Sequence, residues 1–240
     1  MKKIHTFILT IVTSFMPCFL AAQELETIID LHLESWGQDQ LLLVRTAQLD
    51  ITEISGFTKQ SKVQITRKRP NKVRLEGTWE GETFVNVFDG QGYWRIAPWL
   101  GNNDPQEMTP TEISKLSGYP GIDSPLYLAK MDSLEMEYIG EQISDDEPYH
   151  VIRINSAETR FTDYFIDPAS FQIFKTVERD QGNEKYIYQE VFFKSYRPQA
   201  GINMAMEYEI RGRKGTTNIV LTELVLGHGV PNSFFKKPEN

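Results

Sequence analysis

The sequence contains a single cysteine, Cys18, and this residue lies in the N-terminal segment. Residues 24–240 therefore contain no cysteine, and no disulfide bond within them can stabilise a fold. Stability must come from a buried hydrophobic core, and a chain of 240 residues is long enough to build one large core. We predict a single domain over residues 24–240.

Long apolar runs are absent after the N-terminus. The apolar run at residues 8–20 is too short for a stable membrane-spanning helix; it follows two lysines and ends in Ala-Ala-Gln. This pattern predicts a signal peptide over residues 1–23, cleaved near Gln23, and a periplasmic location. Attachment of a lipid to Cys18 is the alternative, although Phe15-Met16-Pro17 before it lacks the small residues that such a site needs.

Basic residues are outnumbered, with 25 lysines and arginines against 33 acidic residues and a net charge of −8. Loss of the two lysines in the leader would make the net charge −10. An acidic protein of this kind is a poor partner for nucleic acid, which we exclude. The local basic run from Lys68 to Arg74 is either a basic patch or a solvated hairpin end, and we prefer the hairpin end.

Catalytic and metal-binding signatures are also missing. The histidines after the leader, His32, His150 and His228, have no metal-binding spacing, and no Gly-x-Ser-x-Gly motif occurs. The densest acids, at 145–147, precede Pro148 and read as a hairpin turn rather than as a pair of hydrolytic carboxylates. We predict no cofactor, no metal site and no enzymatic activity; a glycan or lipid hydrolase is the least supported alternative.

Apolar periodicity predicts one helix at the start of the mature chain. Apolar residues recur at steps of three and four from Leu25 to Trp36, and Gly37 follows where a C-terminal cap belongs. His32 falls on this apolar stripe, and we interpret it as a boundary residue of the helix.

From Thr46 onwards the apolar period becomes two, which is typical of strands with one apolar face. The block from Arg69 to Leu100 contains three such strands, the last two joined by the tight turn Asp89-Gly90-Gln91-Gly92. Further strands are predicted at 136–143, 149–155, 161–166, 173–179, 186–193, 203–211 and 216–226. About a dozen strands with short loops predict one large antiparallel sheet, which must curl.

Two short helices interrupt the strand pattern. Thr109-Pro110-Thr111-Glu112 combines an N-cap, a first-turn proline and a capping-box glutamate, and Asp123-Ser124-Pro125 repeats this logic after a break at 118–121. The predicted fold class is α+β. A large curled antiparallel sheet forms an open, unclosed β-barrel, with an N-terminal helix and short lid helices on its concave side.

Strand alternation also predicts which side chains line the concavity. We assign the following residues to a hydrophobic ligand-binding cavity: Leu49, Ile51, Val63, Ile65, Arg67, Val73, Leu75, Trp79, Val85, Val87, Trp94, Ile113, Leu116, Leu126, Met204, Met206 and Tyr208. Methionine adapts to variable apolar partners, although plain core packing explains the same stripes.

Arg67 is the most unusual member of this set because it shares a strand face with Val63 and Ile65, where a charge needs partners or water. Two interpretations stay open. The strand end reaches solvent at Arg67, or its guanidinium donates hydrogen bonds to carbonyls of the lid helices or to a ligand headgroup.

The order of the motifs resembles the LolA-type outer-membrane lipoprotein-sorting family, in the form common among Bacteroidetes. The segments that carry this resemblance are Ile28 to Leu33 with Gly37, Lys68 to Arg74, Phe88-Asp89-Gly90, Tyr93-Trp94, Glu107-Met108, Tyr164 to Asp167, Gly201 to Met204 and Phe234 to Pro238. The resemblance implies an unclosed β-barrel with helices at its mouth and a hydrophobic cavity that shields acyl chains.

The resemblance further implies a monomeric periplasmic carrier, or chaperone, for the acyl chains of lipoproteins or for another lipid. Its partners would be lipoproteins or lipids, together with sorting components of the inner and outer membranes. The alternative is a non-catalytic scaffold that uses the same fold to hold another envelope protein.

Overall fold

The computed structural model describes residues 16–55, 59–101, 103–157, 159–199, 201–213 and 215–238. Most of the predicted signal peptide lies outside the described residues. The helix α1 (Met16–Trp36) runs continuously past the predicted cleavage position at Gln23, so cleavage there stays a prediction. No described helix combines the length and the apolar character that crossing a membrane requires.

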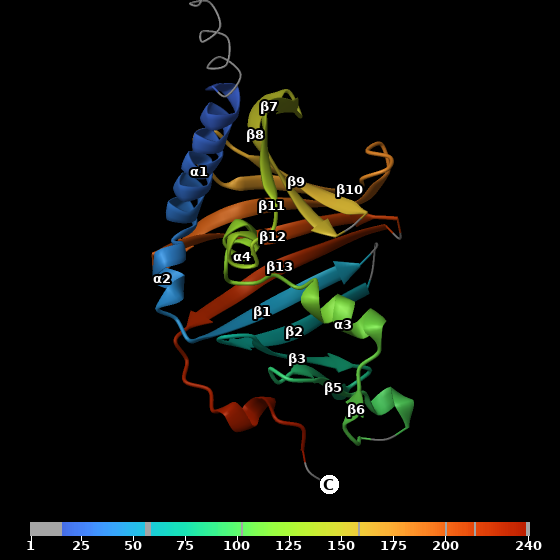
Figure 1. Cartoon of the computed structure of the whole chain (residues 1–240). Coiled ribbons are helices and arrows are strands. Elements are labelled where there is room, and N and C mark those ends of the chain that lie inside the picture. The colour runs from blue at the N-terminus through green and yellow to red at the C-terminus, as the bar shows by residue number, and fades with distance from the viewer. Residues whose placement is uncertain are drawn as a thin grey trace, which may run out of the picture.

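One antiparallel sheet contains all thirteen described strands (Figure 1). Their order is β6-β5-β4-β3-β2-β1-β13-β12-β11-β10-β9-β8-β7, and the two outer strands, β6 and β7, do not pair with each other. The strands are β1 Thr46–Ser55, β2 Lys59–Lys68, β3 Lys72–Trp79, β4 Glu82–Phe88, β5 Tyr93–Ile96, β6 Gln106–Glu107, β7 Met136–Ser144, β8 Glu147–Ala157, β9 Arg160–Ile166, β10 Ile173–Asp180, β11 Ile187–Gln199, β12 Ile202–Gly212 and β13 Gly215–Leu226. The predicted α+β class and the unclosed antiparallel sheet are confirmed.

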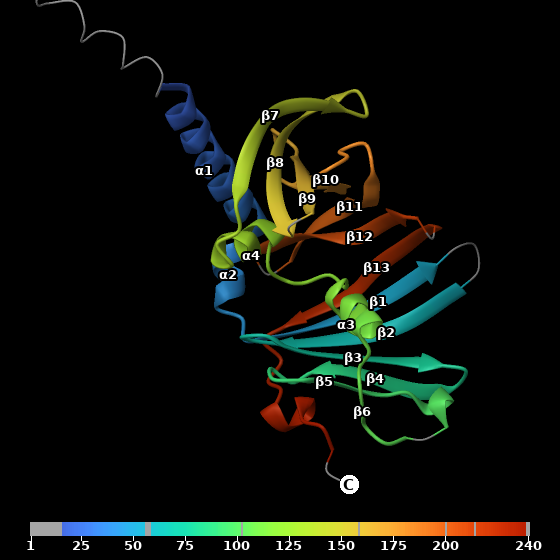
Figure 2. The same cartoon turned by 45° about the vertical axis from the view of Figure 1, so that its right-hand side comes forward.

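The helices lie in front of the curled sheet, on its concave side (Figure 2). Besides α1 they are α2 (Gln38–Leu42), α3 (Pro110–Ser117) and α4 (Pro125–Met131). The described residues also form two short 3-10 helices, η1 (Pro98–Leu100) and η2 (Asn232–Phe235), of which η2 packs on the opposite, convex face. We use the name lid for α3, α4 and the lid segment 118–124 that joins them.

Local sequence signals explain where these helices begin and end. The Thr109 hydroxyl accepts a hydrogen bond from the Glu112 backbone N–H while the Glu112 carboxylate accepts from the Thr109 backbone, a complete capping box for α3. The Ser124 hydroxyl caps α4 by accepting from Leu126 N–H. At the end of α1, Gly37 adopts a positive φ of 76°, and a Cβ there would stand 2.2 Å from the Gly201 carbonyl oxygen.

The core has separate parts on the concave side. Under α3 and the lid segment, β1, β2, β3, β12 and β13 contribute Leu49, Ile65, Leu75, Met204 and Leu221, all nearly inaccessible to solvent. Under α1 and α4, β8 to β10 contribute Ile152, Ile154, Ile166 and Ile173, which pack against Ile28, Ile29 and Leu126.

The register of β3 and β4 corrects part of the sequence interpretation. Trp79 pairs with Glu82 across the two-residue turn at 80–81, so Leu75 faces Asn86 and Gly77 faces Phe84. Val85 and Val87 therefore lie on the outer, convex face of the sheet. Trp94 pairs with Val87 and joins them there. The expectation that these three residues line the same concavity as Val73 and Leu75 is wrong.

The C-terminal segment covers this outer face. Phe235 of η2 is fully buried against Val85, Val87 and Trp94, and the Trp94 indole N–H donates to the Phe235 carbonyl oxygen over 3.1 Å. Arg74 adds a hydrogen bond to the Phe234 carbonyl at 3.0 Å and stacks over the Phe234 ring. This segment closes a second small core on the convex side.

Candidate functional site

A cavity of about 520 Å³ lies between α3 and the ends of β1 to β4 on the concave side. Its apolar wall is made by Val63, Leu75, Phe84 and Leu116, with Trp79 and Trp99 at its rim. The Phe84 ring occupies the space that a side chain at position 77 would take, because a Cβ on Gly77 would lie 2.6 Å from that ring. A volume in this range is typical of pockets for small molecules, about 300 to 1,000 Å³.

One end of this cavity is polar. The Tyr119 hydroxyl donates to the Glu53 carboxylate over 2.6 Å, and Lys115 lies 3.9 Å from the same carboxylate. Burial and the neighbouring Glu53 charge raise the pKa of the Tyr119 hydroxyl, which therefore stays protonated. Glu112 of α3 forms an ion pair with Arg95 of β5 at another part of the cavity mouth. The cavity thus has an apolar wall and a polar rim.

Arg67 holds the lid against the sheet. Its Nη2 donates to the carbonyl oxygens of Tyr119 and Pro120, each over 3.0 Å, and its Nε has no partner among the described residues. Burial lowers the pKa of the guanidinium to about 10, while Asp123 and Tyr208 partly offset that effect. Arg67 therefore remains charged at neutral pH. Of the two interpretations, the hydrogen bond to lid carbonyls is confirmed.

A second set of polar contacts fixes the other end of the lid segment. Trp36 Nε1 donates to the Ile122 carbonyl over 3.0 Å, and Gln38 Nε2 donates to the Asp123 carboxylate over 2.7 Å. Arg69 forms an ion pair with the same carboxylate at 2.5 Å. The Ser124 backbone N–H donates to the Gln38 side-chain oxygen over 2.9 Å. The lid segment is thus tied to α1, α2 and the turn after β2 by polar groups.

His32 is a fully buried member of this network rather than a boundary residue. Its Nδ1 donates to the Phe171 carbonyl oxygen and its Nε2 accepts from the Ser124 hydroxyl, each over 2.7 Å. A carbonyl can only accept, so Nδ1 carries a hydrogen, and Nε2 accepts as long as the ring is neutral. Burial lowers the pKa of His32 to about 4, although the hydrogen bond to Phe171 opposes the shift. His32 links α1, the lid and the loop before β10.

The structure distributes the sequence-predicted cavity residues over several places. Around the 520 Å³ cavity lie Val63, Leu75, Trp79 and Leu116. Leu49, Ile51, Ile65, Met204 and Met206 are buried in the core behind it, and Ile113 packs against that core. Tyr208 lines a smaller cavity of about 180 Å³ beside Trp36 and Pro120, while Arg67 and Val73 line one of about 240 Å³ beside Gly121 and Ile122. Leu126 belongs to the core under α1.

Several lining residues were missed by the sequence interpretation. Phe84, Asn86, Trp99, Glu53 and Tyr119 all contribute to the cavity. The turn at Glu80-Gly81 was a usable signal for two of them, because a two-residue turn pairs position 79 with 82 and so puts 84 and 86 on the Trp79 face. Trp99 and Tyr119 lie outside the strands, where no periodicity places them.

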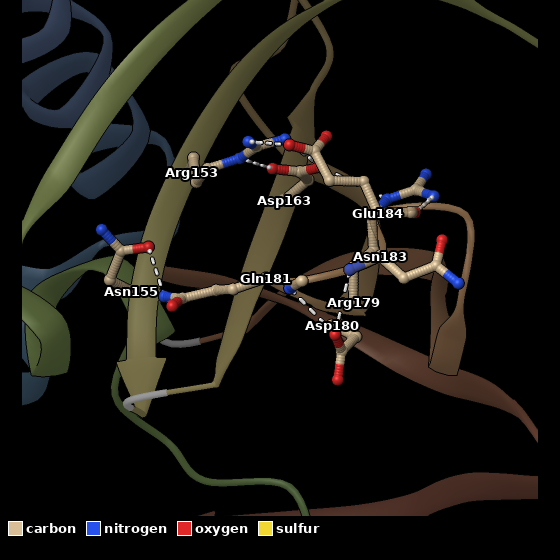
Figure 3. A network of polar contacts seen from close by, with 9 residues as sticks. Arg153, Asn155, Asp163, Arg179, Asp180, Gln181, Asn183 and Glu184 are labelled. Atoms are coloured by element: carbon tan, nitrogen blue, oxygen red, sulfur yellow. Dashed lines mark hydrogen bonds and ion pairs between the residues drawn. The ribbon is translucent and has the colours of Figure 1, made fainter.

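The remaining polar clusters do not resemble a reactive centre. The described residues bring together no group of three or more His, Cys, Asp or Glu side chains able to hold a metal ion. On the outer face of β8 to β10, Asp163 accepts from Arg153 over 2.8 Å and lies 3.4 Å from Arg179, and Arg153 also meets Glu184 at 3.5 Å (Figure 3). These paired charges tie neighbouring strands and the loop after β10 together.

Comparison with known proteins gives a likeness of fold. Neither a protein-family model nor a curated protein matches the sequence. Among solved structures, a LolA superfamily protein from Nitrosomonas europaea is 12% identical, with a TM-score of 0.60, over 88% of this chain and 97% of that one. A putative outer membrane lipoprotein-sorting protein domain from Vibrio parahaemolyticus is 11% identical, with a TM-score of 0.60 over the same shares.

A DUF1329 family protein from Desulfovibrio piger has a TM-score of 0.63 at 12% identity, over 88% of this chain and 96% of that one. At identities this low the likeness establishes the shared fold alone. The fold is that of LolA superfamily structures, as the resemblance implied, whereas the Bacteroidetes form stays a prediction.

Proposed function

We propose that the protein is an exported carrier that shields the acyl chains of a lipoprotein, or of another lipid, between its concave sheet face and its lid. The cavity under α3 is the observation that carries this proposal, because its wall is apolar and its rim is polar. A site of this kind suits a ligand with an apolar chain and a polar end. The likeness in fold to a lipoprotein-sorting domain supports the same assignment.

The lid defines how such a ligand would enter. In the structure, Leu116, Tyr119 and Ile122 of the lid are themselves buried against the concave face. A long acyl chain needs some of this space, so binding requires the lid to move away from the sheet. Arg67 opposes that movement through its two hydrogen bonds to lid carbonyls, and we propose that it sets the closed state.

Bound cargo provides the direct test. Protein purified from its native envelope should release lipid or lipoprotein in mass spectrometry after extraction with organic solvent. A protein that is always empty would contradict the carrier assignment. A single stoichiometric protein partner without lipid would instead favour a scaffold on the same fold.

A matched pair of variants locates the binding face. Leu75 and Val87 are both almost fully buried, but Leu75 lines the cavity and Val87 packs under Phe235 on the outer face. Leu75→Asn should lower lipid capture well beyond the loss expected from its reduced stability, whereas Val87→Asn should lower stability alone. Trp79→Gln at the partly exposed rim provides a third variant. Equal lipid capture by all three would show that this face does not bind the cargo.

Arg67→Met tests the closed state. The substitution removes the charged donor and leaves two carbonyls without their partner, which costs about 1 to 3 kcal/mol locally. Removal of a buried charge partly offsets this cost. We expect faster hydrogen exchange at the lid segment, with little change in exchange at β12 and β13. Unchanged exchange at the lid would show that Arg67 does not hold it.

A further inference from the structure

A second apolar groove lies where α2 meets β1. It is at the opposite ends of β1 and β2 from the cavity under α3. This groove has a volume of about 600 Å³ and is lined by Leu43, Val44, Leu226 and Val230 together with polar backbone and side chains. The only charged residues in its lining are Arg45 and Lys68, and no carboxylate takes part. The lining of the groove is therefore apolar and positively charged, in a protein whose net charge is −8.

Two leucines at this end are exposed, and hydrogen bonds to the backbone hold them in place. The sequence has three consecutive leucines at 41–43, of which Leu41 is fully buried while Leu42 and Leu43 are 43% and 79% exposed. Leu43 is the most exposed large hydrophobic residue among the described part of the chain. Arg69 donates to the Leu41 and Val44 carbonyls over 3.2 and 3.0 Å, which anchors the backbone on both sides of them. The outward position of Leu43 is built into the fold.

The cations beside these leucines are available to a negatively charged partner. The Arg45 carbonyl accepts from Arg69 N–H, whereas its exposed side chain makes no hydrogen bond or ion pair with any described residue. Lys68 lines the groove and donates to the Val230 carbonyl over 2.5 Å, and an ammonium group has two further hydrogens to donate. Both residues also line the cavity of about 240 Å³ that leads to Arg67 and Gly121, so this end adjoins the lid segment.

We propose that this end, formed by Leu42, Leu43, Arg45 and Lys68, docks on a membrane surface that carries anionic lipids. Exposed leucines beside cations match the interface of a bilayer, where apolar side chains enter the acyl boundary and cations pair with lipid phosphates. An acidic protein could pair with the same cations. A lipid surface would in addition bury the two adjacent exposed leucines of this short, anchored turn. The proposal does not depend on which cargo the cavity binds.

Flotation with lipid vesicles tests the proposal on the protein purified after export, with its N-terminus established by mass spectrometry. The wild-type protein should float with phosphatidylcholine vesicles that contain phosphatidylglycerol and much less with pure phosphatidylcholine, and added salt should weaken the binding. Arg45→Gln should weaken it about five-fold, since one cation near an anionic surface contributes about 1 kcal/mol. Leu43→Asn should weaken it roughly ten-fold or more, because it removes the leucine side chain that the bilayer would bury.

Two variants elsewhere provide matched controls. Ile143 is 71% exposed on the β7 to β8 hairpin, and Lys185 is exposed in the loop after β10, so Ile143→Asn and Lys185→Gln remove the same chemistry far from the groove. Both should bind vesicles as the wild type does. Equal binding to neutral and anionic vesicles, or wild-type binding by Leu43→Asn and Arg45→Gln, would overturn the proposal.

Competing explanations have distinct outcomes in the same experiment. If inorganic phosphate at moderate concentration binds the groove while vesicles do not, the site takes a free anion and the membrane proposal is refuted. Capture of an acidic protein without vesicle binding refutes it as well. Failure of the carrier function appears elsewhere, as an absence of bound lipid in the protein from the envelope, and leaves vesicle flotation unchanged.

Discussion

The buried histidine of the lid network predicts a specific loss of stability in mild acid. His32 has a pKa of about 4 in the folded protein, against 6.5 for an ordinary histidine, because burial disfavours its charged form. Between these two values the unfolded chain binds more protons at this position than the folded chain does. The stabilisation is therefore complete above about pH 6.5 and decreases as the pH falls towards about 4.

The structure sets the size of the effect. The full difference between the two pKa values corresponds to about 3 kcal/mol, and about 2 kcal/mol of it is lost between about pH 7.5 and pH 5. A protonated ring also has a hydrogen on Nε2, and the Ser124 hydroxyl could then no longer donate to that nitrogen. Protonation of His32 therefore weakens the contact between α1 and the lid.

Urea unfolding at these two pH values, followed by tryptophan fluorescence, measures the loss. The wild-type protein should lose about 2 kcal/mol of unfolding free energy through this residue, whereas His32→Gln should lack that part of the pH dependence. The substitution also alters hydrogen bonds at every pH, so the difference between the two pH values is the informative quantity. His228→Gln, at an exposed position, should keep the wild-type dependence.

The carboxylates with lowered pKa values do not interfere with this comparison. Asp89, held by backbone N–H groups and Lys72, and Glu209, paired with Lys194 and Arg211, lose their stabilisation as the pH falls through still lower values. They are also the same in both proteins. Parallel pH dependence of wild type and His32→Gln would refute the reasoning and show that His32 is accommodated in its charged form.

Three further substitutions test the fold, each by urea unfolding at neutral pH. Phe235→Ala should cost about 3 to 5 kcal/mol, because it empties the small core under η2; a loss below 1 kcal/mol would show that the C-terminal segment does not stabilise the sheet. Gly37→Ala should cost at least about 1 kcal/mol, since its φ is 76° and its Cβ would clash with the Gly201 carbonyl; an unchanged midpoint would contradict this backbone geometry. Thr109→Ala should cost about 1 kcal/mol through loss of the α3 cap, and no loss would mean that packing alone fixes α3.

The sheet and its helices were predictable because short-range signals decide them. Two-residue alternation identified the strands, the capping box at Thr109 identified α3, and Ser124-Pro125 identified α4. Each signal acts within a few residues and needs no knowledge of distant contacts. Gly37 ended the first helix for the same reason, although its close approach to Gly201 is visible only in the structure.

The composition of the cavity was harder to predict, because hydrophobicity alone does not tell which face of a strand points inwards. Val85 and Val87 are apolar and alternate correctly, yet a covering segment more than 140 residues away, at Phe235, gives them a core on the convex side. The sequence signal that outweighs hydrophobicity is the turn length at Glu80-Gly81, which fixes the register. A sheet with both faces partly covered offers two apolar faces, and only the register distinguishes them.

The way in which the lid is held bears on what could open it. At Arg67, Trp36 and Gln38 the lid segment is held through hydrogen bonds, and water can replace such bonds when the segment moves. The lid's apolar contacts, through Leu116 and Ile122, are different. When the lid moves, these side chains become exposed to water, and water makes no bond with them that offsets the free-energy cost. An acyl chain that takes the place of these side chains on the concave face would remove that cost, whereas a polar ligand would not. Under the carrier function proposed above, the closed lid would therefore select for apolar cargo.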